Sequence, residues 1–168
     1  IARQLENGPA PRRALIEAAY AAFPGWLTPD AELLAACLES YGQPEGDLLR
    51  LRDEDQPRQR DADLAGMLHL LANLGRRLSF TVEMAAPGQT AAEVIWSHAQ
   101  EPAFAFAVVS QASLHPWLHP ASDALAGCPR YVVLPGGRAA LLDFKLRRCP
   151  PWRTQLAWTG WEFVKFRH

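Results

Sequence analysis

The stretch that decides the fold is "EVIWSHAQEPAFAFAVVSQAS", residues 93–113. The acidic Glu93 opens a short apolar run, and a second apolar run follows it and ends in small polar residues. Two strand-like runs separated by a few turn-forming residues predict a β-hairpin. The second run, "AFAFAVVS" at 103–110, is apolar on both faces, which is typical of a central strand covered by helices.

The residues around this hairpin predict further helices and strands. An amphipathic helix precedes it in "DADLAGMLHLLANLGRRL", 61–78, where a stripe predicted to be buried consists of Leu64, Met67, Leu68, Leu71, Leu74 and Leu78. The other predicted elements are strands at 78–84 and 92–99, a Pro-rich helix at 114–126, a strand at 130–134, a helix at 135–148 and a strand at 161–166. Hairpin-linked strands followed by an αβαβ half predict an α/β (α+β) domain, in which a mixed β-sheet is flanked by helices.

The N-terminal part predicts two helices and a short strand. The first helix lies in "APRRALIEAAYAAFPG", 10–25, and the strand in "GDLLRLRD", 46–53. The second helix follows Thr28, which is expected to be the N-cap, with Pro29 at the first helical position and Gly42 near the C-cap.

A charged stretch separates these elements from the α/β part. Residues 53–63, "DEDQPRQRDAD", have almost no apolar side chain, which predicts a linker or a solvated connection. The expected domains are therefore a small helical module at 1–56 and an α/β domain at 57–168.

Composition limits the classes of function. Seventeen basic and eighteen acidic residues give a net charge of −1, so a surface for nucleic acid must come from local clustering. No apolar run reaches the roughly 20 residues of a membrane helix, and no glycine-rich phosphate loop occurs, so neither a membrane nor a nucleotide is expected as a partner. The three cysteines lack metal-site spacing, which predicts reduced thiols in a cytoplasmic protein. We also expect the chain to be a domain of a longer protein.

The order of elements resembles the restriction-endonuclease-like fold of the PD-(D/E)XK nuclease superfamily. In that family one strand begins with an acidic residue, and the next strand ends in an acidic residue, any residue and a lysine. Glu93 in "EVIW" looks like the first acidic residue. Ala107 stands in the second acidic place and Val109 in the lysine place. The resemblance therefore implies a nuclease-like domain with a degenerate active site.

The chemistry of such nucleases explains why these departures matter. Their usual cofactor, Mg²⁺, requires several oxygen ligands in near-octahedral geometry, and neither alanine nor valine supplies one. No catalytic residue, metal or cofactor is therefore expected; if the chain is catalytic, the cofactor is Mg²⁺ and its ligand is Glu93. A shifted site would draw on Glu83, Gln111 or Asp63, although strand alternation weighs weakly against Glu83. An engineered replacement of a catalytic glutamate by Ala107 also stays open.

Two other clusters have functional interpretations. A nucleic-acid surface is predicted near the C-terminus, from the basic residues Lys145, Arg147, Arg148 and Arg153 together with Trp152. The alternative for these residues is a solvated helix end. "HPWLH" places His115 and His119 four residues apart, as in zinc pairs, without an evident third ligand.

The N-terminal helices, "GWLTP" and "DLLRLRD" resemble a fragment of a winged helix. In that family the second of these helices lies in the DNA major groove. Here it carries Asp30, Glu32 and Glu39, which oppose phosphates and favour protein contact or a brace between domains.

Three functions follow as hypotheses. The first is a non-catalytic, DNA-associated or scaffolding domain of a larger DNA modification, repair or defence protein. The second is an active Mg²⁺-dependent nuclease with ligands shifted around Glu93. The third is a protein-interaction module without nucleic acid, whose partners are other domains or subunits.

Overall fold

The chain forms two compact units in the computed structural model. The described residues are 1–85, 92–119, 125 and 127–166. The units divide between Asp61 and Ala62, close to the start of the longest helix. Within the described residues, every helix is too short or too polar to cross a membrane.

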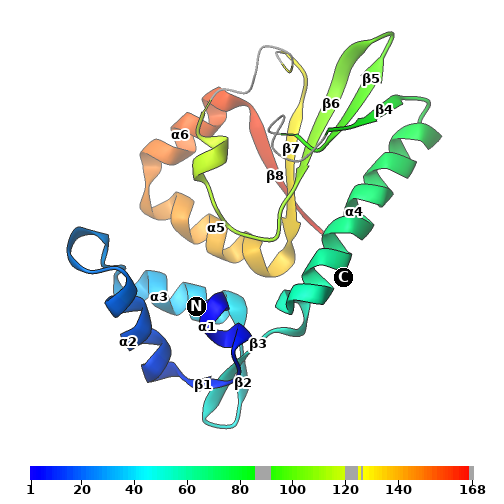
Figure 1. Ribbon diagram of the computed structural model, residues 1–168. Coiled ribbons are helices and arrows are strands. Elements are labelled where there is room, and N and C mark those ends of the chain that lie inside the picture. Colours follow the sequence, from blue (N-terminus) through cyan, green and yellow to red (C-terminus); the bar gives the residue numbers. More distant parts are fainter. Residues whose placement is uncertain (86–91, 120–124, 126, 167–168) are drawn as a thin grey trace. The chain divides into compact units, whose positions relative to one another are not determined.

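The first unit combines three α-helices with a small antiparallel sheet (Figure 1). Its elements are α1 (Ala2–Glu6), β1 (Ala10–Pro11), α2 (Arg12–Ala22), α3 (Ala31–Tyr41), β2 (Gly42–Glu45) and β3 (Leu48–Leu51). The strand order is β1-β3-β2, and the buried core contains Leu5, Leu15, Leu38 and Leu51. The two predicted helices and the strand at β3 are confirmed. Three elements were missed, because α1 and β1 are very short and β2 contains glycine and proline, which strands disfavour.

The predicted N-cap of α3 is wrong. Asp30, not Thr28, caps this helix, since its Oδ1 accepts a hydrogen bond from the backbone N–H of Leu33 at 2.8 Å. Pro29 therefore lies before the helix. Both Thr28 and Asp30 are good capping residues, and the carboxylate has the additional advantage of a negative charge at the positive end of the helix dipole.

The predicted linker at 53–63 is also wrong in part. Asp53–Asp55 form a 3₁₀ turn, η2, and α4 (Pro57–Arg77) begins directly after it. Asp55 is buried, with 4% of its surface exposed. Proline suits the first position of a helix because its φ is already helical. The first turns of α4 are polar, so hydrophobic periodicity gave no signal there.

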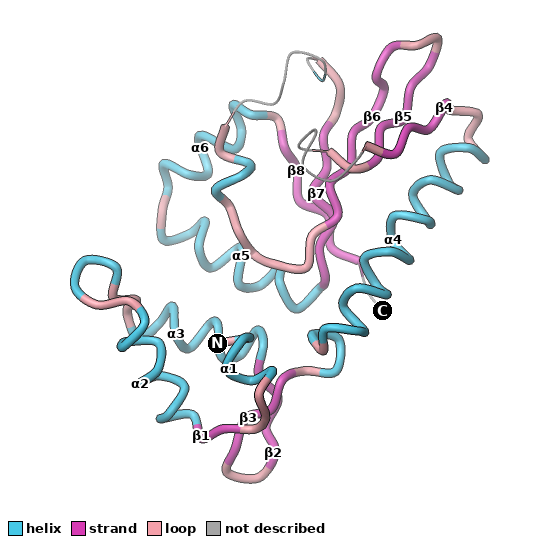
Figure 2. Tube along the Cα trace, in the orientation of Figure 1, coloured by secondary structure: helices cyan, strands magenta, loops and turns pink. Residues whose placement is uncertain are grey.

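The second unit is a mixed α+β arrangement around a five-stranded mixed sheet (Figures 1 and 2). After α4 its elements are β4 (Thr81–Met84), β5 (Val94–His98), β6 (Glu101–Val108), η3 (His115–Trp117), β7 (Arg130–Pro135), α5 (Gly136–Arg148), α6 (Pro150–Thr159) and β8 (Trp161–Phe166). The strands lie in the order β4-β5-β6-β7-β8. Pairing is antiparallel from β4 to β6 and parallel from β6 to β8. The predicted hairpin and mixed sheet are confirmed.

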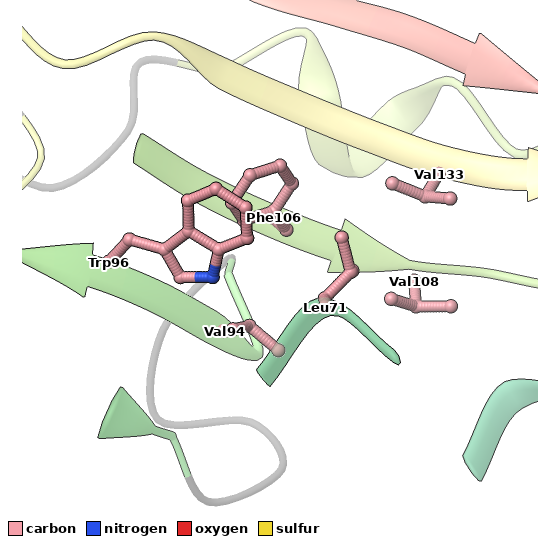
Figure 3. Close-up of a cluster of buried hydrophobic side chains, with 6 residues drawn as sticks. All are labelled: Leu71, Val94, Trp96, Phe106, Val108 and Val133. Carbon is pink, nitrogen blue, oxygen red and sulfur yellow. The ribbon is translucent and has the colours of Figure 1, made fainter. Parts of the chain in front are cut away.

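Helices cover both faces of this sheet. One face packs against α4 through a buried cluster drawn in Figure 3, which consists of Leu71, Val94, Trp96, Phe106, Val108 and Val133. Strand alternation turns Ala105, Ala107, Val132 and Leu134 toward the opposite face, where all four are buried. There α5 contacts β7 and β8, and α6 contacts β8.

Three details of the second unit differ from the sequence analysis. Leu74 and Leu78 were expected in the buried stripe of α4 but are 42% and 56% exposed, since the stripe runs through Leu71 and Gly75 instead. Helix α6 was missed, because it opens with two prolines and has no clear apolar stripe. Of the helix predicted at 114–126, η3 is a short 3₁₀ turn, whereas 120–124 and 126 lie outside the described residues.

A first prediction concerns the contact between α4 and the sheet. A Cβ atom at Gly75 would lie 2.6 Å from Nε1 of Trp96 and 2.7 Å from Cγ2 of Val82, so Gly75→Ala should force the helix away from the sheet. We expect it to destabilise the second unit by about 1–3 kcal/mol, despite alanine's better helix propensity. Native-state hydrogen exchange of β5 and β6 amides measures this unit separately from the first.

Gly66 on the same helix is the matched control, because a Cβ there meets nothing within 4 Å. Gly66→Ala should stabilise the unit by about 0.5–1 kcal/mol. Equal effects of the two substitutions would contradict the close packing of α4 at Gly75.

Candidate functional site

Glu93 lies directly before β5, outside the ladder that pairs Val94 with Phe106. Its backbone N–H also donates to the carbonyl of Phe106, at 2.8 Å, so the regular register does not continue past Val94. The side chain of Glu93, and not its backbone pairing, brings it to the peptide between Ala107 and Val108.

The carboxylate of Glu93 is engaged with the backbone. Its Oε2 accepts a hydrogen bond from the N–H of Val108 at 2.7 Å. Strand β5 begins at Val94, so the ladder does not extend to Val108 on this side, and the Glu93 side chain supplies the acceptor that a longer β5 would have provided. A buried N–H left without an acceptor costs free energy, which makes this contact structural.

Partial burial raises the pKa of the Glu93 carboxyl above its ordinary value, because desolvation disfavours the charged form. The hydrogen bonds from Val108 and from the backbone N–H of Glu93 act in the opposite direction and are the smaller effects. The Glu93 carboxyl is therefore partly desolvated and hydrogen-bonded to the backbone.

Neither of the two neighbouring motif positions supplies a ligand. Ala107 is completely buried, and Val109 is half-buried, with its N–H donating to the carbonyl of Val133 at 2.9 Å. Both side chains are hydrocarbon, so neither can coordinate a metal ion. One carboxylate bonded to a backbone N–H does not fit the octahedral oxygen shell that Mg²⁺ requires.

The shifted ligands considered from the sequence are placed differently from one another. Glu83 on β4 pairs with Ile95, which the register turns away from α4. It is exposed on the edge strand. Gln111 is exposed beyond the end of β6, and Asp63 belongs to α4, which packs on the opposite face.

Across the residues that the structure describes, no three His, Cys, Asp or Glu side chains are grouped as metal ligands. None of the three cysteines forms a disulfide. The rings of His115 and His119 lie 5.1 Å apart in an edge-to-face arrangement, and both residues are exposed.

The loop after β6 is held by two cations from α5. Arg138, only 1% exposed, donates from Nε to the carbonyl of Ser110 at 3.2 Å, and Lys145 donates from Nζ to the carbonyl of Ala112 at 2.6 Å. Sequence reasoning missed Arg138. The signal was its spacing, because Arg138, Leu141, Leu142 and Lys145 recur at i, i+3, i+4 and i+7, which defines one face of a helix.

The predicted basic surface lies on α5 and α6, with its members in different environments. Lys145 holds the loop, Arg147 pairs with Asp143 at 3.0 Å, and the guanidinium of Arg148 lies 5.5 Å from the ring centre of Phe144. Arg153 is exposed and Trp152 is 38% exposed. The exposed members are therefore Arg147, Arg148 and Arg153, whereas Lys145 is hydrogen-bonded to the loop after β6.

Comparisons of the chain with protein-family models, with curated proteins and with solved structures found no match. The functional argument therefore depends on the geometry of the chain itself.

A second prediction follows from the environment of Glu93. Glu93→Gln keeps an oxygen that can accept from Val108 and removes the charge that burial disfavours. Because the pKa is raised in the folded state, the favourable contribution of Glu93 is present at low pH and is lost as the pH rises through the raised value. The stability of Glu93→Gln should therefore increase relative to the wild type between about pH 4 and pH 7.

Hydrogen exchange or urea unfolding across this pH range measures the difference. Glu83→Gln, which removes an exposed carboxylate from the neighbouring strand β4, is the control and should show no such divergence. A wild type that gains stability over Glu93→Gln as the pH rises would contradict the proposed environment.

Proposed function

We propose that the chain is a non-catalytic domain of nuclease ancestry that associates with DNA, or scaffolds proteins that do, within a larger cytoplasmic protein of DNA modification, repair or defence. The observation that carries this proposal is the hydrogen bond from Val108 to the Glu93 carboxylate, next to the buried Ala107. An acid that would bind metal in a nuclease here completes the hydrogen bonding of the sheet.

The nuclease ancestry is supported by the order and pairing of the elements. One helix precedes three antiparallel strands, and β7 follows parallel to the last of them. The hydrogen bond from Val108 also brings the Glu93 carboxylate close to Ala107, and this proximity supports their interpretation as the two acidic positions of the motif in the family that the sequence resembles.

The first unit is proposed to be a winged-helix-like module for protein contact. Its order of helix, strand, two helices and hairpin, with strands arranged β1-β3-β2, supports this relationship. Acidic residues are exposed on α3 and at the tip of the β2–β3 hairpin, namely Glu32, Glu39, Glu45 and Asp47. Carboxylates at these positions oppose phosphates, so a partner protein suits this surface better than a DNA groove.

The third prediction tests the absence of catalysis. We expect the purified protein to leave supercoiled plasmid and single-stranded DNA intact in Mg²⁺ or Mn²⁺, while binding DNA with an affinity that falls as salt rises. Metal-dependent cleavage that disappears in Glu93→Ala would replace this proposal by an active nuclease. Absence of DNA binding even at low salt would favour the protein-interaction module.

The fourth prediction tests the ancestry by restoring the missing acid. Ala107→Asp places a second carboxylate beside Glu93, and two partly buried like charges destabilise the fold by several kcal/mol. Because the pair resembles a metal site, Mn²⁺ should recover part of this loss, measured as a rise in the unfolding midpoint.

Ala105→Asp is the matched control, since Ala105 is equally buried on the same face but lies opposite Ile95. Its stability should not respond to Mn²⁺. A similar response of both variants, or of neither, would contradict a nuclease-like arrangement at Glu93 and Ala107.

A further inference from the structure

The surface of α6 exposes a large aromatic side chain beside a hollow. Trp158 is 87% exposed, although tryptophan is highly buried on average. The hollow has a volume of about 470 Å³ and is lined by Leu118, Pro151, Thr154, Gln155, Trp158 and Thr159. Four of these residues recur at i, i+3, i+4 and i+7 on α6, so a single face of the helix forms most of the lining.

The two walls of the hollow, η3 and α6, are linked by direct contacts. The hydroxyl of Thr159 on α6 donates to the carbonyl of Trp117 in η3 at 2.8 Å, and Leu118 follows Trp117 directly. The rings of Trp117 and Trp161 pack edge to face with centres 4.9 Å apart. Both contacts are buried, so the hollow is formed before any ligand arrives.

The lining combines flat apolar surfaces with a few polar groups. Trp158 supplies an aromatic face, and Leu118 and Pro151 supply aliphatic walls. Thr154 and Gln155 add a hydroxyl and an amide that can donate and accept hydrogen bonds. A planar heteroaromatic ring with polar edges, such as a nucleobase, matches this combination.

The charges of α5 and α6 favour a nucleic acid over an apolar peptide. Residues 136–160 contain five of the seventeen basic residues of the chain and one of its eighteen acidic residues. Two of these cations are hydrogen-bonded to the loop after β6 and Arg147 pairs with Asp143, whereas Arg153 is exposed on α6. Arg153 and Trp158 are five residues apart on α6, which is roughly 7.5 Å of helix rise.

We propose that this hollow binds an unpaired base of single-stranded nucleic acid, stacked on Trp158, with the flanking phosphates continuing across α6 toward Arg153. The inference rests on the proposed function only in taking nucleic acid as a partner. It names a site on the α5–α6 side of the second unit, separate from Glu93 and Ala107.

The fifth prediction tests this pocket with a fluorescein-labelled oligothymidine, followed by fluorescence anisotropy on the full chain. Trp158→Ala should weaken binding by between about 5-fold and 150-fold, the range measured for loss of one base-stacking contact. Arg153→Ala should reduce the slope of log affinity against log salt by about 0.7. The control is Trp26→Ala, which removes a fully exposed indole from the first unit and should leave binding unchanged.

A duplex of the same length and polyglutamate serve as competitors. Unchanged oligothymidine affinity in Trp158→Ala, with the duplex still bound, would refute the pocket and leave the proposed DNA association intact. Absence of binding to both nucleic acids at low salt would refute both proposals. Equal competition by polyglutamate, with no effect of Trp158→Ala, would show a general anion surface and also refute the pocket.

Discussion

The alternation of large and small side chains along β6 is the constraint on which the second unit depends. Phe104, Phe106 and Val108 point toward α4, whereas Ala105 and Ala107 point toward the opposite face. This strand joins the antiparallel half of the sheet to the parallel half. Its bulky face builds the core with α4, and its small face is completely buried at Ala105 and Ala107. A larger side chain at 107 would therefore have to displace its neighbours.

The same strand explains the structural role of Glu93. Val108 belongs to the core through its side chain, while its N–H extends beyond the start of β5 and needs an acceptor. A glutamate at the first position before β5 reaches it, at the cost of some desolvation. The raised pKa and the short hydrogen bond are two consequences of this placement. An acid that looks catalytic in the sequence can therefore be required by the geometry of a strand end.

The elements of the second unit that have strong hydrophobic periodicity were predicted from the sequence. Those whose conformation depends on local backbone geometry were not. Helix α4, the β5–β6 hairpin, β7, α5 and β8 follow from apolar patterns that tertiary packing reinforces. The hairpin was predicted but its turn type was not, because Ala99 and Gln100 adopt positive φ values of 49° and 70° without the usual Asn-Gly pair. Helix α6 was missed because it opens with two prolines and has no clear apolar stripe. At the candidate site, the contact between Glu93 and the N–H of Val108 depends on how two strand ends meet, which no single segment encodes.

Acidic and basic side chains are concentrated in different parts of the chain. The acidic side chains of α3 and the β2–β3 hairpin lie in the first unit, whereas the basic side chains of α5 and α6 lie in the second. The net charge of −1 conceals this separation, because the two contributions nearly cancel. An anionic ligand is attracted to the basic surface and repelled by the acidic one. Binding of nucleic acid at α6 and protein contact at α3 are then compatible in one chain, and neither requires the metal chemistry that Ala107 and Val109 do not support.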